Sequence, residues 1–177
     1  MDQDFARKVK GHKRRKKALI FVIVAVIAAV IVVPLLRRMR EGSPVLVTVE
    51  IRCDELSSDL SKLKDKNLLD YVPKDGTILP KQTIEIESGM TVLDALDQAC
   101  KSNDIQIEYS YTPAYDSYYV EGINYLYEFN GGRYSGWSYE VNRESPMVGC
   151  SQYKLKGGEE ILWTYTCSLS KGAEKGK

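Results

Sequence analysis

The chain has 177 residues, and its 25 lysines and arginines nearly balance its 24 aspartates and glutamates, for a formal net charge of +1. This length allows one ordinary domain plus a targeting element and excludes a large multidomain enzyme. The charges are unevenly divided, because residues 1–40 carry a net charge of +9 and residues 41–177 a net charge of −8. The single histidine, His12, lies in the basic part. The acidic part therefore has no imidazole for a Ser-His-Asp triad, a Cys-His pair or a histidine-ligated metal site.

An uninterrupted apolar segment, residues 18–36, separates the two parts. As a helix rising about 1.5 Å per residue it would be roughly 28 Å long, close to the hydrocarbon thickness of a bilayer. We therefore expect a single transmembrane helix over residues 18–36, after a basic head at 1–17 and before a linker at 37–44. A cleaved signal peptide is the alternative, but the segment is longer than a usual signal core and no small-x-small cleavage motif follows it.

The basic residues that flank this segment predict its orientation. Eight lysines and arginines precede it and three arginines follow it. Because positive charge stays on the cytoplasmic side, we expect a single-pass cell-membrane protein with a cytoplasmic N-terminus and an extracellular C-terminal domain. Next to a span, the basic head is expected to contact anionic lipid headgroups rather than nucleic acid.

Residues 45–168 have the pattern of one α+β domain, followed by a small polar tail at 169–177. Alternating apolar and polar residues predict several strands: Val45–Arg52, Thr83–Glu87, Ile105–Tyr111, Tyr118–Ile123, Ser135–Val141 and Glu160–Thr166. One helix is expected after Thr91, an N-cap residue followed by the apolar positions of an amphipathic helix that ends near Ser102. The order of elements favours a β-grasp-like fold, in which one mixed sheet curves around one main helix.

All four cysteines lie after the apolar segment, in a region that we expect to be oxidising. Their spacing forms no CxxC motif, so two disulfides are favoured over a metal site, with four free thiols as the alternative. In a β-grasp fold the first and last strands are parallel neighbours, which would bring Cys53 and Cys167 within bridging reach. Cys100 and Cys150 would then form the second disulfide.

Ten of the 12 tyrosines lie between Tyr109 and Tyr153. Tyrosine has a broad apolar face and a polar tip, which suits a binding surface, although aromatic pairs also stabilise sheets. Catalysis is not expected: a pair of carboxylates could hydrolyse glycosides, but among 22 acidic residues most pairs are simply solvated. A surface with a net charge of −8 also argues against binding nucleic acid.

Several segments resemble the transcobalamin-like C-terminal domain family, in order and over nearly all of residues 45–167. They include Val49–Cys53, Val72–Leu79, Gly89–Leu96, Tyr119–Ile123, Leu126–Phe129, Ser135–Asn142, Gly149–Leu155 and Trp163–Cys167. The bacterial members that the chain most resembles are membrane-anchored surface proteins of Gram-positive bacteria whose function is unknown. The resemblance implies a β-grasp-like domain related to the smaller domain that closes over cobalamin in the animal carriers.

The resemblance also implies where a ligand would bind. Ser135, Gly136, Trp137 and Tyr139 match the part of the animal domain near its ligand, with burial in the core as the alternative for Trp137. The complete set of expected ligand-binding residues is Tyr118, Tyr119, Tyr127, Tyr134, Ser135, Gly136, Trp137 and Tyr139. The chain has no room for the helical barrel of the animal carriers, so it would form only half of a corrinoid pocket.

The leading hypothesis is a membrane-anchored extracellular binding module that captures a cobalamin-like or other flat amphipathic ligand for uptake. It would need no intrinsic cofactor, with cobalamin as a bound ligand, and its partners would be a vitamin transporter of the ECF type or a second cobalamin-binding protein. The alternative is a protein-interaction module without a small-molecule ligand, which docks on a transporter or surface protein through the tyrosine-rich face or a free sheet edge.

Overall fold

The computed structural model describes residues 21–23, 25–28, 30–32 and 42–168, and the chain divides into two compact units, residues 1–43 and 44–177. In the first unit the described residues between 21 and 32 are helical. The predicted basic head at 1–17, most of the linker and the tail at 169–177 lie outside the described residues.

The predicted transmembrane helix over residues 18–36 is wrong. No helix in the described part of the chain is long and apolar enough to cross a membrane. A crossing needs about 20 consecutive apolar residues in one helix, and the helical residues described in this stretch are 21–23, 25–28 and 30–32.

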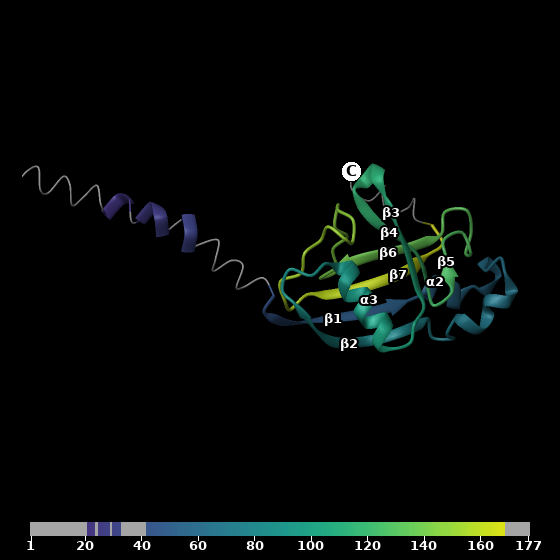
Figure 1. The fold of residues 1–177 in the computed structure, drawn as a ribbon. Coiled ribbons are helices and arrows are strands. Elements are labelled where there is room, and N and C mark those ends of the chain that lie inside the picture. The colour runs from purple at the N-terminus through teal and green to yellow at the C-terminus, as the bar shows by residue number, and fades with distance from the viewer. Residues whose placement is uncertain (1–20, 24, 29, 33–41, 169–177) are drawn as a thin grey trace, which may run out of the picture. The chain divides into compact units, whose positions relative to one another are not determined.

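The second unit is built on a four-stranded sheet with the order β2-β1-β7-β6 (Figure 1). Its strands are β1 (Pro44–Arg52), β2 (Thr77–Glu87), β6 (Gly136–Val141) and β7 (Glu160–Thr166). The central pair, β1 and β7, is parallel, with Ile51 opposite Trp163, and the two outer pairs are antiparallel. Alternation along the strands directs one set of side chains into the core, including Val49, Ile51 and Trp163, each no more than 2% exposed.

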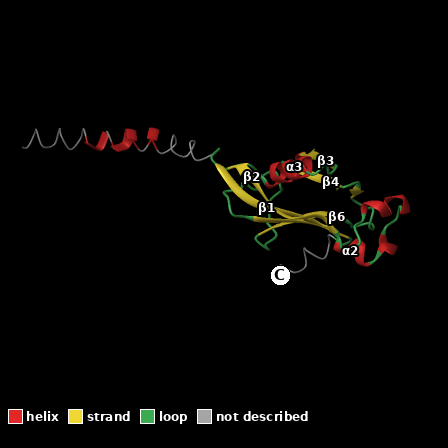
Figure 2. Ribbon diagram, turned by 90° about the horizontal axis from the view of Figure 1, so that it is seen from below, coloured by secondary structure: helices red, strands yellow, loops and turns green. Residues whose placement is uncertain are grey.

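Helix α3 (Val92–Ser102) covers one face of this sheet (Figure 2). It begins at a capping box, in which the Thr91 hydroxyl accepts a hydrogen bond from the Asp94 backbone N–H (3.2 Å) and the Asp94 carboxylate accepts one from the Thr91 N–H (2.7 Å). Leu96 and Ala99 of this helix are fully buried in the core. The predicted amphipathic helix is confirmed.

Three further strands form a separate small sheet with the order β3-β4-β5. They are β3 (Ile107–Thr112), β4 (Ser117–Ile123) and β5 (Leu126–Tyr127), and the one-turn 3-10 helix η3 (Pro113–Tyr115) joins the first two. β3 and β4 lie on the same side of the large sheet as α3 (Figure 2). The described domain is therefore mostly β-structure in two sheets with a few short helices, which corrects the prediction of a transmembrane helix followed by one mixed sheet.

The segment between β1 and β2 contains short helices that the sequence pattern did not indicate. They are α2 (Asp54–Ser58) and the 3-10 helices η1 (Leu60–Lys62) and η2 (Lys66–Tyr71). Leu56 and Leu63 from this segment are buried in the core. Helices this short have too few apolar positions to show a period in the sequence.

The four cysteines are free thiols in this structure, and no disulfide joins them. Cys53, Cys100 and Cys150 are buried and Cys167 is half-buried. Burial raises the pKa of the thiols of Cys53 and Cys100 to about 12 and that of Cys150 to about 11. The predicted pairs Cys53–Cys167 and Cys100–Cys150 are thus not present here. The four thiols instead pack in or against the core as small apolar side chains.

Candidate functional site

A hollow of about 370 Å³ lies where the β3–β4 hairpin meets the turn that begins at Gly149. Six residues line it: Thr112, Tyr115, Ser117, Tyr118, Tyr119 and Gly149. None of these side chains carries a charge at neutral pH. The surface that a ligand would meet is therefore made of aromatic faces and hydroxyl groups.

The hairpin is shaped by its connecting turn. Pro113 begins η3, and Asp116 ends it in the left-handed conformation with φ 47°, which aspartate tolerates better than most residues. The Asp116 carboxylate accepts a hydrogen bond from the Tyr111 hydroxyl at 2.6 Å. Thr112 then pairs with Ser117, so the turn presents Tyr115 to solvent with 77% of its surface exposed.

A second turn, residues 149–152, contacts the end of the hairpin where β3 turns into β4. The Ser151 hydroxyl accepts a hydrogen bond from the Tyr118 N–H at 3.0 Å and lies 2.9 Å from the Ser117 hydroxyl. The Gln152 amide donates to the backbone carbonyls of Asp116 (2.9 Å) and Tyr115 (3.2 Å). These bonds fix both walls of the hollow relative to each other, which lowers the conformational cost of binding.

Gly149 allows the turn at residues 149–152 to pack closely against Ser117 of the hairpin. A Cβ at position 149 would lie 1.8 Å from the Ser117 hydroxyl oxygen and 2.5 Å from the Ser117 Cβ. Any side chain there would push the turn away from the hairpin. Sequence reasoning missed Gly149, Thr112, Tyr115 and Ser117 as site residues, since only the tertiary contact between the two turns brings them together.

Tyr118 packs its ring against two neighbours on β3. The ring centroids of Tyr109 and Tyr118 are 5.6 Å apart at 88°, and those of Tyr111 and Tyr118 are 5.5 Å apart at 63°. Edge-to-face aromatic pairs of this kind contribute stability in addition to that of the apolar area they bury. All three rings remain exposed by more than a third, so the cluster is a preformed aromatic surface beside the hollow.

Tyr119 is half-buried, and its hydroxyl is held in the neutral form. Burial, together with the nearby carboxylate of Glu128, raises the pKa of Tyr119 to about 12. At neutral pH this lining residue is therefore a neutral phenol and not a phenolate.

Of the eight ligand-binding residues predicted from the sequence, the structure brings Tyr118 and Tyr119 together in the hollow. Ser135, Gly136 and Trp137 are buried instead. The Trp137 indole donates a hydrogen bond to the Leu126 carbonyl at 2.8 Å, and the Ser135 hydroxyl lies 2.9 Å from that of Tyr165. This segment belongs to the core, the alternative that the sequence left open for Trp137.

The remaining three predicted residues lie apart from the hollow's lining. Tyr127 donates a hydrogen bond to the Glu108 carboxylate at 2.7 Å, which raises the pKa of its hydroxyl. Tyr134 is exposed, with the guanidinium of Arg133 at 5.5 Å from its ring centroid. Tyr139 is half-buried against Trp163, donates to the Val148 carbonyl at 2.6 Å, and has its pKa raised to about 12 by burial.

The opposite face of the large sheet has a smaller, charged hollow of about 190 Å³. Its lining includes Glu50, Lys81, Glu140, Arg143 and Glu160. Lys81 and Glu160 form an ion pair at 2.8 Å, which lowers the pKa of Glu160. The three acidic and two basic residues of this lining leave a formal net charge of −1, so the hollow presents no strong excess of charge to a ligand.

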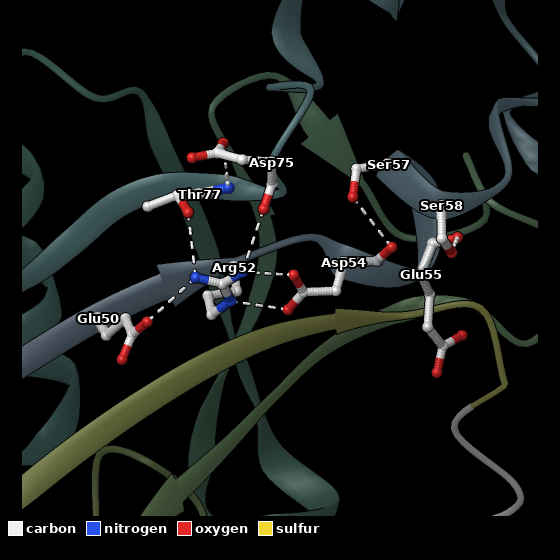
Figure 3. Close-up of polar contacts among 8 residues, drawn as sticks. All are labelled: Glu50, Arg52, Asp54, Glu55, Ser57, Ser58, Asp75 and Thr77. Carbon is white, nitrogen blue, oxygen red and sulfur yellow. Dashed lines mark hydrogen bonds and ion pairs between the residues drawn. The ribbon is translucent and has the colours of Figure 1, made fainter.

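Next to this charged hollow, the side chain of Arg52 forms hydrogen bonds that stabilise the fold (Figure 3). Its guanidinium donates two hydrogen bonds to the Asp54 carboxylate (2.8 and 2.5 Å), and others to Thr77 (3.0 Å) and the Asp75 carbonyl (3.1 Å). The bonds to Asp54 are the main reason that the pKa of Arg52 is raised. This cluster joins the end of β1 to the start of β2 and is structural.

Within the residues that the structure describes, no group of three or more His, Cys, Asp or Glu side chains is placed to hold a metal ion. The hollow beside the β3–β4 hairpin, with its uncharged lining of tyrosines and hydroxyl-bearing residues, is the candidate site that the geometry favours.

Comparison with known proteins supports the fold. The family model described as domain of unknown function DUF4430 matches residues 89–167. The crystal structure of haptocorrin in complex with Cbi is similar to this chain, with a TM-score of 0.53 and 18% identity over 72% of this chain and 26% of that one. This chain spans about a quarter of haptocorrin, and at this identity the likeness shows a shared, transcobalamin-like fold.

A second similar structure is a putative metal binding protein from Ruminococcus gnavus, with a TM-score of 0.41 and 11% identity over 69% of this chain and 96% of that one. No curated protein matches the chain.

Proposed function

We propose that the domain is a binding module that holds a small, flat, amphipathic molecule in the hollow beside the β3–β4 hairpin. A cobalamin-like compound is the first candidate. Two things support that choice: the family resemblance and the shared fold with haptocorrin, whose structure contains Cbi. The observation that carries the proposal is the hollow itself, an uncharged cavity with Tyr115, Tyr118 and Tyr119 in its wall.

The lining matches the chemistry of such a ligand. Tyrosine rings provide broad apolar contact, and the hydroxyl of Thr112 can hydrogen-bond to amide or hydroxyl groups at a ligand's edge. Affinity would come from ring contacts and neutral hydrogen bonds, so it should depend only weakly on salt.

The size of the hollow implies partial enclosure. At about 370 Å³ it lies near the lower end of the range of ligand pockets, about 300–1,000 Å³. A molecule as large as a corrinoid would leave much of its surface outside. We propose that a second protein, such as a vitamin transporter or another cobalamin-binding protein, covers the rest.

We propose binding without catalysis. The hydroxyl of Tyr119 stays protonated at neutral pH because its pKa is raised to about 12, so it is a poor general base. The other lining groups are a threonine, a serine, two tyrosines and a glycine, which suit contact and orientation.

The test is a titration of the full-length chain with cobalamin and other corrinoids, followed by corrinoid absorbance and by tyrosine and tryptophan fluorescence. A saturable change in both signals is expected, because the exposed tyrosines would be covered by the ligand. No response at hundreds of micromolar corrinoid would contradict cobalamin-type binding by this chain.

A further inference from the structure

The outer edge of β3 is an unpaired sheet edge. β3 is an edge strand of the three-stranded sheet and pairs only with β4 among the described strands (Figure 1). The four residues Glu108–Tyr111 are all exposed. A strand that is exposed on both faces and along one edge can accept another strand beside it.

The hydrogen bonds of β4 show which backbone groups of β3 point outward. The Tyr118 N–H donates to the Ser151 hydroxyl, and its carbonyl accepts from the Ser117 hydroxyl, so both groups point away from β3. Tyr111 lies opposite Tyr118 and therefore forms a pair without ladder hydrogen bonds. By the alternation of an antiparallel ladder, the N–H and C=O groups of Tyr111 and Tyr109 face the free edge.

The edge strand β2 of the four-stranded sheet is protected by contrast. Leu46 directs its carbonyl toward Gly158 (2.7 Å), so its partner Glu85 points its backbone outward. The Gln98 side chain occupies that position, donating to the Glu85 carbonyl at 2.7 Å. β2 also contains Pro80 and Lys81, residue types that block strand addition, whereas residues 107–112 contain neither.

The two faces beside the free edge differ in chemistry. Tyr109 and Tyr111 form the aromatic face with Tyr118. On the other face the carboxylates of Glu108 and Glu121 accept hydrogen bonds from the neutral hydroxyls of Tyr127 and Ser110. Lys101, the nearest lysine along the chain before β3, is engaged by Asp97 at 2.5 Å.

We propose that the outer edge of β3 docks an extended polypeptide segment whose side chains alternate between basic and apolar. The segment would add as a further strand and exchange backbone hydrogen bonds with Tyr109 and Tyr111. Its apolar side chains would lie against the tyrosine face, and its basic side chains would lie on the same face as the carboxylates of Glu108 and Glu121. This interaction uses the strand edge and does not depend on a ligand in the hollow.

The test uses a fluorescein-labelled peptide, Lys-Val-Lys-Val-Lys-Val-Lys, and fluorescence anisotropy with the full-length chain. Tyr109→Pro removes an outward N–H, and Tyr109→Ala loses the same ring but keeps that N–H. Binding to the wild type and to Tyr109→Ala is expected, with about tenfold weaker binding to Tyr109→Pro because a peptide carbonyl loses its partner. Equal affinity for the Pro and Ala variants would overturn the edge as the docking site.

A second variant covers the case in which Tyr109→Pro does not fold. Glu108→Lys combined with Glu121→Lys keeps the strand edge and reverses the charge beside it. This double variant should bind Glu-Val-Glu-Val-Glu-Val-Glu better than the lysine peptide, and the wild type should show the reverse preference. An unchanged preference, or self-association of the wild type that Tyr109→Pro abolishes, would contradict the proposed partner.

Discussion

Gly149 and Ser117 show how one contact between two residues can define a site. The hollow exists because the turn at 149 approaches the hairpin at 117 more closely than any side chain would permit. Neither residue stands out in the sequence, since glycine and serine are common in turns. Tyr118 and Tyr119, which do stand out, line a hollow whose shape depends on this less visible pair.

Gly149→Ala should destabilise the domain by about 1–3 kcal/mol, the usual cost of forcing an extra carbon into a packed contact. Removing the opposing side chain should relieve the clash, so Gly149→Ala combined with Ser117→Gly should be less destabilised than the sum of the two single variants. Urea unfolding of all three variants measures this coupling. Strict additivity would mean that the two turns do not touch as described.

At the scale of elements, individual helices and strands were the most predictable features of the fold. Thr91 and the apolar positions after it predicted α3, and the capping box and the buried side chains of the helix confirm it. Strand alternation likewise predicted β4, β6 and β7. The expected parallel pairing of the first and last strands, β1 and β7, is confirmed. The separate sheet of β3, β4 and β5 was not expected, because alternation along a strand does not show which sheet it joins.

Thr91→Ala should lower the free energy of unfolding by about 1 kcal/mol, since the Asp94 N–H at the start of α3 loses its acceptor. Thr91→Ser keeps the hydroxyl and should stay within a few tenths of the wild type. Urea denaturation gives both values. An alanine variant as stable as the serine variant would show that the cap does not contribute.

At the scale of the whole molecule, three sequence-based expectations differ from what the structure shows. Hydropathy alone indicated a membrane-spanning helix, whereas the described residues contain no helix of sufficient length. Composition and position indicated disulfides, whereas the structure has four thiols, three of them buried. The segment at Ser135–Trp137 was assigned to a ligand, and its burial could not be read from a sequence in which core and surface aromatic residues look alike.

The buried thiols predict how stability depends on pH. Their pKa is raised by burial from 9.0 to about 12 for Cys53 and Cys100 and to about 11 for Cys150. Above pH 9 the unfolded chain loses these protons while the folded domain keeps them, so stability is complete below that pH and falls as pH rises. The fall should be at most about 1.4 kcal/mol per thiol for each pH unit.

Urea unfolding between pH 8 and pH 10 without added reductant tests this, and Cys100→Ala should show a shallower dependence than the wild type. A free energy of unfolding that does not change over this range is the contradictory outcome. Disulfide-bonded cysteines, which have no proton to lose, would produce it.

The central claim is that the hollow beside the β3–β4 hairpin, and not the buried Ser135–Trp137 segment, receives the ligand. Corrinoid titration of two matched variants tests it most directly, because Tyr115 lines the hollow and Tyr134 is a similarly exposed tyrosine beside the other segment. Tyr115→Ala should weaken binding about tenfold, and Tyr134→Ala should stay within about twofold of the wild type. Loss of binding in Tyr134→Ala with normal binding in Tyr115→Ala would contradict the account.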